Sequence, residues 1–170
     1  GRQDICEIVE HVMALVENQL SKASVHLDLH LPPEGIPVHG DEQQLHQVFL
    51  NLVLNAIDAL KETDGGDLRI EIVTSRKRMQ GAGKNALLEV NCVEVIVSDT
   101  GGGIEEGDLK HLFTPFFTTK ASGCGLGLAV VHGIIREHGG DIEVQSVPGQ
   151  GTSFTVRLPL EGSLAAVGNM

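Results

Sequence analysis

The chain has 170 residues, a length typical of one domain, of which 41% are hydrophobic and 21% charged. These are the proportions of a globular protein rather than of a disordered chain. With 23 acidic and 12 basic residues the formal charge is −11, which argues against nucleic acid and anionic membrane surfaces as partners.

The first third of the chain predicts two helices with strands between them. Apolar residues at helical spacing predict a helix over residues 3–21, and alternating apolar residues predict a strand over 24–31. A short strand is expected near 37–39. A second, longer helix is predicted over 41–61, because its apolar residues form one continuous stripe and Asp41 is a good N-cap.

The rest of the chain predicts two pairs of strands with helices between them. The expected elements are strands over 68–74 and 87–98, a short helix near 105–111, a helix over 126–138, and strands over 141–147 and 151–158. The loop 75–86 joins the first pair of strands and carries Arg76, Lys77, Arg78 and Lys84, a pattern typical of a solvated hairpin tip.

Adjacent strands in the predicted order indicate a mixed, mostly antiparallel sheet with helices on one face. The fold class expected is therefore α+β, a two-layer α/β sandwich rather than a doubly wound sheet. One domain is predicted over 1–160, and the patternless tail 161–170 is predicted to be disordered.

The polar face of the long helix carries a row of side chains at helical spacing: Gln47, Asn51, Asn55 and Asp58. One interpretation is a solvated helix face. The other is that an amide oxygen is a ligand for a hard cation, since Mg²⁺ takes oxygen ligands and often only one or two of them from protein.

Asp99 follows a strand that is expected to be buried, and it opens the sequence Asp-Thr-Gly-Gly-Gly-Ile. A carboxylate at a strand end can accept a hydrogen bond from an exocyclic amine such as that of adenine, and the glycines let backbone approach a flat ring. A plain structural turn is the alternative interpretation.

A glycine loop at 123–128 leads into the helix predicted from 126. Backbone N–H groups at a helix N-terminus favour phosphate, and Lys120 could neutralise its charge. The loop is not a dinucleotide fingerprint, because Leu128 stands where the third glycine belongs. Nor does the chain contain a P-loop, since Asn85 stands at the position that needs Ser or Thr in the nearest candidate.

Cysteine use and hydropathy indicate the compartment. The three cysteines are odd in number and widely spaced, so we expect no disulfide framework and a reducing, cytoplasmic location. Cys124 lies in the glycine loop, either as a redox-sensitive group or as a small residue at a permissive position. No apolar run reaches the ~18 residues of a membrane helix, and a membrane-anchored parent protein stays possible.

In this order, these motifs resemble the N, G1, F, G2 and G3 boxes of sensor histidine kinases, over roughly residues 3–159. That family shares a superfamily with gyrase-type topoisomerases, the heat-shock chaperone and mismatch-repair ATPases. The matching stretches are Asn51 with Asn55, then 99–103, 112–120, 123–128 and 149–152.

The resemblance implies ATP bound between helices, under a mobile lid. It implies that Asn55 coordinates Mg²⁺, that Asn51 and Lys120 are catalytic, and that Asp99 binds the adenine amine. Asp58 stands where some relatives have a basic residue that faces phosphate, so it is not included in the implied phosphate site. The implied nucleotide-binding residues are Asn51, Asn55, Asp99, Gly101, Gly103, Ile104, Thr119, Lys120, Gly123, Cys124, Gly125, Leu126, Gly127, Leu128 and Thr152.

The implied activity is transfer of the γ-phosphoryl group of Mg-ATP to a histidine on a separate dimerisation domain of the same parent protein. A response regulator is then an indirect partner, and this domain alone is expected to be a monomer that binds ATP or ADP. None of the eight histidines opens the His-Glu/Asp-x-x-Arg/Asn-Pro pattern of an acceptor.

Two alternative functions are a nucleotide-binding module without transfer activity and an ATPase of the same superfamily. The ATPases carry a Glu as base one turn before the Mg²⁺ asparagine. Asn51 stands at that position here and cannot take a proton, which argues against efficient hydrolysis. The intact Asn55 and Asp99 argue against a degenerate module.

Overall fold

The computed structural model describes residues 1–80, 87–117 and 127–160. The tail 161–170, predicted to be disordered, and Lys84 of the predicted loop lie outside these residues. In chain order the elements are β1 (Arg2–Asp4), α1 (Ile5–Leu15), α2 (Glu17–Lys22), β2 (Val25–His30), β3 (Pro37–His39), α3 (Glu42–Glu62), β4 (Gly66–Gln80), β5 (Leu87–Asp99), α4 (Glu106–Leu109), α5 (Gly127–Glu137), β6 (Asp141–Val147) and β7 (Gly151–Pro159).

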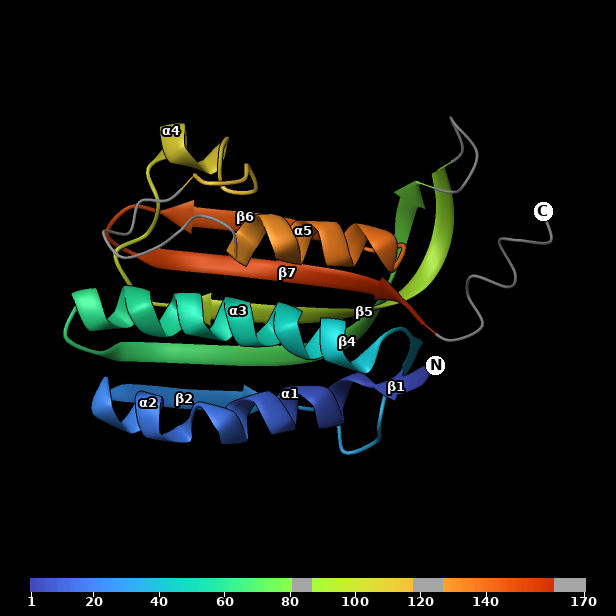
Figure 1. Cartoon of the computed structure of the whole chain (residues 1–170), viewed down its shortest axis with the longest axis horizontal. Coiled ribbons are helices and arrows are strands. Elements are labelled where there is room, and N and C mark those ends of the chain that lie inside the picture. The colour runs from blue at the N-terminus through green and yellow to red at the C-terminus, as the bar shows by residue number, and fades with distance from the viewer. Residues whose placement is uncertain (81–86, 118–126, 161–170) are drawn as a thin grey trace.

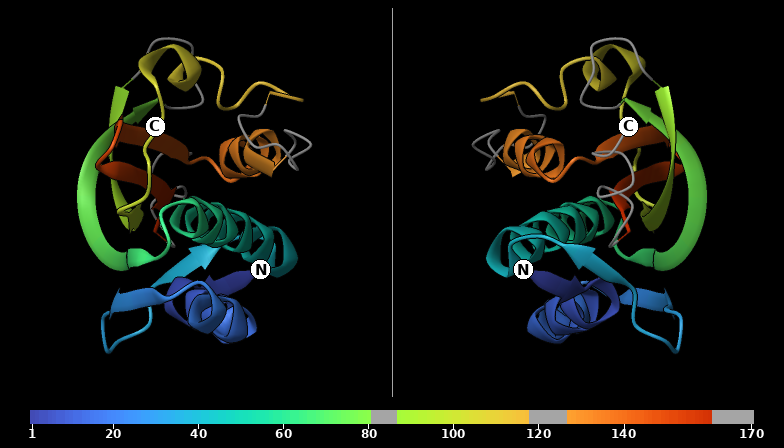
Figure 2. Two further views of the ribbon diagram at one scale, coloured as in Figure 1. Left: turned by 90° about the vertical axis from the view of Figure 1, so that its left-hand side faces the viewer. Right: turned by 90° about the vertical axis from the view of Figure 1, so that its right-hand side faces the viewer.

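The main sheet has the strand order β2-β4-β5-β7-β6. Only the β2–β4 pair is parallel, and the other three pairs are antiparallel. The helices α1, α3 and α5 lie along one face of this sheet, and no helix of the described residues covers the other face (Figures 1 and 2). The predicted α+β two-layer sandwich with a mixed sheet is therefore confirmed.

The central helix α3 packs against the sheet and against the neighbouring helices α1 and α5. Its N-cap Asp41 accepts a hydrogen bond from the Gln44 backbone N–H at 2.9 Å, as the sequence predicts. Its apolar stripe is buried against the sheet and the neighbouring helices, and each large side chain in it contributes about 1.5–3 kcal/mol of hydrophobic stabilisation. The buried residues of α3 are Leu45, Val48, Phe49, Leu52, Val53, Ala56, Ile57 and Leu60.

The predicted helix over 3–21 is wrong in its extent. Its first residues form β1, which pairs antiparallel with β3, and α1 begins only after Asp4. The Asp4 carboxylate accepts from the backbone N–H of Cys6 at 3.0 Å and of Ile36 at 3.1 Å. Val16 separates α1 from α2 and is itself buried. The helical spacing of apolar residues therefore continues across Val16, so this spacing alone cannot reveal the break between α1 and α2.

The predicted loop over 75–86 is also wrong in its extent. β4 continues to Gln80, so Arg76, Lys77 and Arg78 lie in a strand that pairs with β5. This distal part of the hairpin bends away from the plane of the sheet (Figure 1). Strand prediction depends on alternating apolar and polar residues. Consecutive basic residues lack this alternation, because both faces of such a hairpin can be exposed to solvent.

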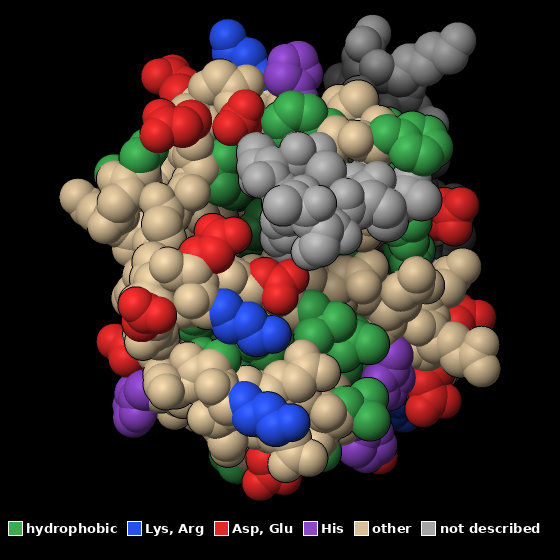
Figure 3. All heavy atoms as spheres, turned by 60° about the vertical axis from the view of Figure 1, so that its left-hand side comes forward, with side chains coloured by type: hydrophobic (Ala, Val, Ile, Leu, Met, Phe, Trp, Pro, Cys, Tyr) green, Lys and Arg blue, Asp and Glu red, His purple; other side chains and the backbone are tan. Residues whose placement is uncertain are grey.

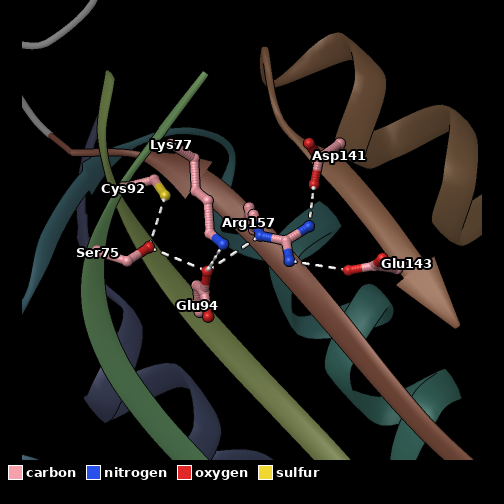
Figure 4. A network of polar contacts seen from close by, with 7 residues as sticks. All are labelled: Ser75, Lys77, Cys92, Glu94, Asp141, Glu143 and Arg157. Carbon is pink, nitrogen blue, oxygen red and sulfur yellow. Dashed lines mark hydrogen bonds and ion pairs between the residues drawn. The ribbon is translucent and has the colours of Figure 1, made fainter. Parts of the chain in front are cut away.

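An ion-pair network centred on Arg157 of β7 joins four strands (Figure 4). The guanidinium binds Glu94 of β5 at 3.0 Å, and Asp141 and Glu143 of β6 at 3.2 and 2.8 Å. Ser75 of β4 donates to Glu94 at 2.9 Å. Burial raises the pKa of Glu94, but hydrogen bonds from Arg157 and Ser75 outweigh it, so the net pKa is lowered.

In the part of the chain that the structure describes, no helix is both long and apolar enough to cross a membrane.

Candidate functional site

Asp99 is the last residue of β5, and its side chain is almost entirely buried at the end of the strand (9% exposed). The Gly101 backbone N–H donates to its Oδ1 at 2.9 Å. Burial raises the pKa of Asp99, and hydrogen bonds from the backbone of Gly101 and Thr152 oppose this rise. A carboxylate has about four acceptor positions, so these donors leave it able to accept from a ligand.

The turn after Asp99 is packed too tightly for side chains at two of its glycines. A Cβ at Gly101 would lie 2.9 Å from both the Ala59 Cβ and the Asp99 Oδ1. Gly103 has a φ of +74°, and a Cβ there would collide with the carbonyl oxygen of Val147. The predicted glycines therefore bring the turn directly against α3 and the end of β6.

Ser146 of β6 links the two sides of this turn, although sequence reasoning did not select it. Its hydroxyl accepts from the Ile104 backbone N–H at 2.8 Å and donates to the Gly151 carbonyl at 3.0 Å. It also bonds the Thr152 hydroxyl at 2.8 Å. Ser146 pairs with Thr152 in the hairpin that joins the strands predicted over 141–147 and 151–158, so the register of that hairpin was a usable signal.

The polar face of α3 contacts the start of α5. Asn51 Nδ2 donates to the carbonyl oxygen of Gly127 at 3.4 Å, so the N box and the end of the predicted glycine loop are adjacent. Asn55 follows one turn later, and Ala59, against which Gly101 packs, one turn after that. At 1.5 Å per residue, the Asn51 and Ala59 ends of this row are ~12 Å apart.

The predicted residues thus fall into two groups. Asp99, Gly101, Gly103, Ile104 and Thr152 gather around the ends of β5 and β6. Asn51, Asn55, Gly127 and Leu128 lie along α3 and the first turn of α5, where Leu128 packs against the core. The other predicted residues lie outside the described part of the chain: Thr119, Lys120, Gly123, Cys124, Gly125 and Leu126.

The implied magnesium site can be judged by its donor chemistry. Among the described residues no group of three His, Cys, Asp or Glu side chains could hold a metal ion. The Asn55 amide oxygen is the type of hard ligand that Mg²⁺ accepts, with phosphate and water completing the shell. The residues present therefore fit a cation that arrives with a nucleotide rather than one held by protein carboxylates.

Figure 3 turns toward the viewer the side of the molecule where β5 ends and the connection to α4 begins. Acidic side chains predominate over basic ones on this face. Two cavities lie elsewhere, one of about 520 Å³ near the start of α1 and one of about 410 Å³ beside the β2–β3 connection. Neither of these two cavities is lined by a residue of the predicted site.

Comparison with known proteins shows the family to which the chain belongs. A sequence model of the "Histidine kinase-, DNA gyrase B-, and HSP90-like ATPase" family matches residues 40–162. The sensor histidine kinase ZraS of Escherichia coli (strain K12) is 38% identical over 157 residues, 92% of this chain and 30% of that protein. Sporulation kinase A of Bacillus subtilis (strain 168) is 36% identical over 153 residues, 90% of this chain and 23% of that protein.

Solved structures match over nearly the whole chain. A nucleotide-free catalytic domain of histidine kinase ThkA is 30% identical with a TM-score of 0.73, covering 94% of this chain and 96% of that one. The mycobacterial sensor histidine kinase MprB has a TM-score of 0.74 at 23% identity, covering 94% and 98%, which supports the fold alone.

The fold and the ordered boxes are those of a nucleotide-binding domain of the gyrase, chaperone and kinase type. The chain belongs to the histidine kinase-, DNA gyrase B- and HSP90-like ATPase family, as a histidine kinase catalytic ATP-binding domain. It spans less than a third of the length of the curated relatives described above.

Proposed function

We propose that this domain binds Mg-ATP and transfers the γ-phosphoryl group to a histidine on a separate dimerisation domain of its parent protein, in the cytoplasm. The observation that carries the proposal is the buried Asp99 carboxylate, whose following turn packs through Gly101 on Ala59. Ala59 lies ~12 Å along α3 from Asn51, which contacts Gly127. A response regulator would be the indirect recipient of the phosphoryl group, and the domain itself would act as a monomer.

At the adenine end, Asp99 would accept a hydrogen bond from the exocyclic amine. Its Oδ1 is already oriented by Gly101, so little ordering is needed when the base binds. Thr152 and Gly103 would assist through water, and Ile104 would pack against the ring. Ser146 fixes Ile104 and Thr152 relative to each other, so it would hold the pocket in shape without touching the base.

At the phosphate end, the Asn55 amide oxygen would hold Mg²⁺, which neutralises charge on the phosphates when it is bound. Lys120 and the backbone N–H groups of Gly123, Gly125 and Gly127 would bind the phosphate oxygens. Asn51 donates to the Gly127 carbonyl and would thereby keep that end of α5 beside the phosphates. Phosphoryl transfer depends on such positioning more than on covalent chemistry.

Transfer fits this site better than hydrolysis. Water must lose a proton as it attacks, and a nearby base helps it to do so. The Asn51 amide cannot take that proton, and its Nδ2 is engaged with Gly127. A neutral imidazole nitrogen attacks with its own lone pair and needs no base beforehand, so a histidine acceptor suits the groups that are present.

The test of the adenine end is a change of base preference. In Asp99→Asn the remaining acceptor oxygen would stay on the Gly101 N–H, and the new amide N–H₂ would face the adenine amine. We expect ATP binding to weaken about 10-fold or more, because two donors would then oppose each other. Inosine triphosphate, which presents a carbonyl at this position, should lose much less affinity. Calorimetry with both nucleotides gives the two dissociation constants.

Asp64→Asn is the matched control, since Asp64 is exposed and has a φ of +58°, which asparagine tolerates. It should bind both nucleotides like the wild type. The proposal fails if the wild-type domain binds neither ATP nor ADP, or if Asp99→Asn binds ATP as tightly as the wild type.

A further inference from the structure

His138, the residue directly after α5, makes a long-range contact that the proposed function does not use. Its Nε2 lies 3.1 Å from the backbone N of Asp41, and its Nδ1 lies 2.8 Å from the carbonyl oxygen of Ile134. Asp41 caps the N-terminus of α3, and Ile134 belongs to the last turn of α5. One imidazole therefore joins the end of one helix to the beginning of the other.

The two partners define the form of the ring. A backbone N–H can only donate, so Nε2 must be the unprotonated acceptor. A carbonyl can only accept, so Nδ1 must carry the proton. His138 is thus a neutral imidazole in one tautomer, and both of its nitrogens are used. A side chain bound at both polar atoms has one orientation rather than several rotamers.

Two glycines, Gly40 and Gly140, allow close packing around the His138 ring and the end of α5. A Cβ at Gly40 would lie 2.7 Å from His138 Cδ2 and 2.8 Å from Nε2, so the ring lies directly against a glycine. The next turn is equally close on the other side, because a Cβ at Gly140 would collide with the carbonyl oxygen of Arg157 in β7. The end of α5 is therefore held between the start of α3 and the sheet.

The helices α3 and α5 lie side by side (Figures 1 and 2) and are connected at both ends of α5. Asn51 donates to Gly127 at the first residue of α5, and His138 accepts from Asp41 at the other end. The segment from Asp41 to Asn51 spans about 15 Å of helix, and that from Gly127 to His138 about 16 Å. The two antiparallel spans match, so both contacts form at one relative position of the helices.

Apolar packing alone would define this position less sharply. The buried face of α5 consists of Val131, Ile134 and Ile135, and aliphatic contacts of this kind tolerate small shifts better than directional hydrogen bonds do. We propose that His138 is a positioning residue for phosphoryl transfer. It sets the axial position of α5 against α3, and thereby the place of Gly127 and the phosphate-binding end beside Asn51 and Asn55.

This inference rests on the proposed function, and its test separates the phosphate end from the adenine end. His138→Leu fills the site with an apolar side chain and removes both hydrogen bonds of the imidazole. Gly40→Ala introduces a methyl group that displaces the imidazole ring. Each should lower the affinity for ATP about 10-fold and slow transfer to an added acceptor domain, while affinity for adenosine stays within 2-fold of the wild type. Unchanged adenosine binding also shows that the variant has folded.

His138→Gln can still accept from the Asp41 N–H through its amide oxygen, so it should recover most of the ATP affinity that His138→Leu loses. Glu137→Gln, an exposed neighbour, is the control and should behave like the wild type. A purely structural helix end would give variants that melt at lower temperature but bind ATP and adenosine in the wild-type ratio, and that result overturns the inference.

A measurement made without nucleotide tests the role of His138 independently of the proposed function. In nuclear magnetic resonance spectra, the Gly127 backbone amide and the Asn51 side-chain amide should both shift in His138→Leu and return toward their wild-type positions in His138→Gln. If the wild-type domain binds no nucleotide yet these shifts occur, the proposed function fails while the coupling stands. If nucleotide binds but neither amide moves, the inference fails alone.

Discussion

At the scale of single residues, Asp99 is the place where function and stability oppose each other. Burial raises its pKa, so its folded pKa lies above the unfolded value of about 3.9. Between these two pKa values the folded state holds more protons than the unfolded state, and stability falls as pH rises through that window. At neutral pH the ionised carboxylate is therefore a cost that the fold tolerates.

Asp99→Asn removes this charge but keeps an acceptor for Gly101. We expect its free energy of unfolding to exceed that of the wild type at pH 7, with the advantage shrinking as pH falls through the folded pKa of Asp99, where the wild-type carboxyl becomes neutral. Urea denaturation over a pH series measures the difference. An advantage that grows as the pH falls would contradict the assigned direction of the pKa shift.

Local sequence information was sufficient for the position of some candidate site residues and not of others. The place of Asp99 at a strand end and the glycine turn after it could be predicted because both are local patterns. Ser146 was missed because its role depends on the pairing of β6 with β7, and His138 was read only as a helix end. Its partner Asp41 lies 97 residues away, beyond the reach of any local pattern.

At the scale of elements, the same division between local and long-range information holds. α3 could be predicted because its stripe and N-cap lie within one helix. The boundary between β1 and α1 could not, since β1 exists only through pairing with β3. The extension of β4 likewise depends on its partner β5 rather than on its own basic residues.

The Arg157 network makes a prediction about how the strands are held together. Arg157→Met should lower the free energy of unfolding by about 2 kcal/mol at pH 7, because Glu94 would lose its main partner while half-buried among other carboxylates. The pKa of Glu94 is lowered in the fold, so its contribution is present above the unfolded pKa of about 4.3 and is lost as pH falls through the folded pKa.

The wild type and Arg157→Met should therefore converge in stability as pH falls through the folded pKa of Glu94. Arg69→Met is the matched control, since Arg69 pairs with Asp28 and Glu71 but is half-exposed, and it should change stability by no more than about 0.5 kcal/mol. Urea titrations over a pH series test both variants. A loss in Arg157→Met that persists unchanged at pH 3 would show that the lost packing of the side chain, and not its charge, is responsible.

At the scale of the whole molecule, the charge of −11 bears on how ATP could be bound. An acidic domain repels a free nucleoside triphosphate. The repulsion is weaker once a divalent cation is bound to the phosphates. Positive groups are therefore needed at one place only, and the proposed site supplies them through backbone N–H groups, Lys120 and the cation.

The last prediction concerns the division of the reaction between two domains. Incubated alone with γ-labelled ATP and Mg²⁺, this domain should remain unlabelled, because none of its histidines lies in the sequence pattern of an acceptor. When the dimerisation domain of the parent protein is added, label should appear on that domain, and it should be lost in acid as expected of a phosphohistidine. An acceptor domain with its histidine changed to glutamine is the control. Label on this chain itself, or release of inorganic phosphate as fast as label appears on the acceptor, would favour a self-phosphorylating domain or an ATPase over the transferase proposed here.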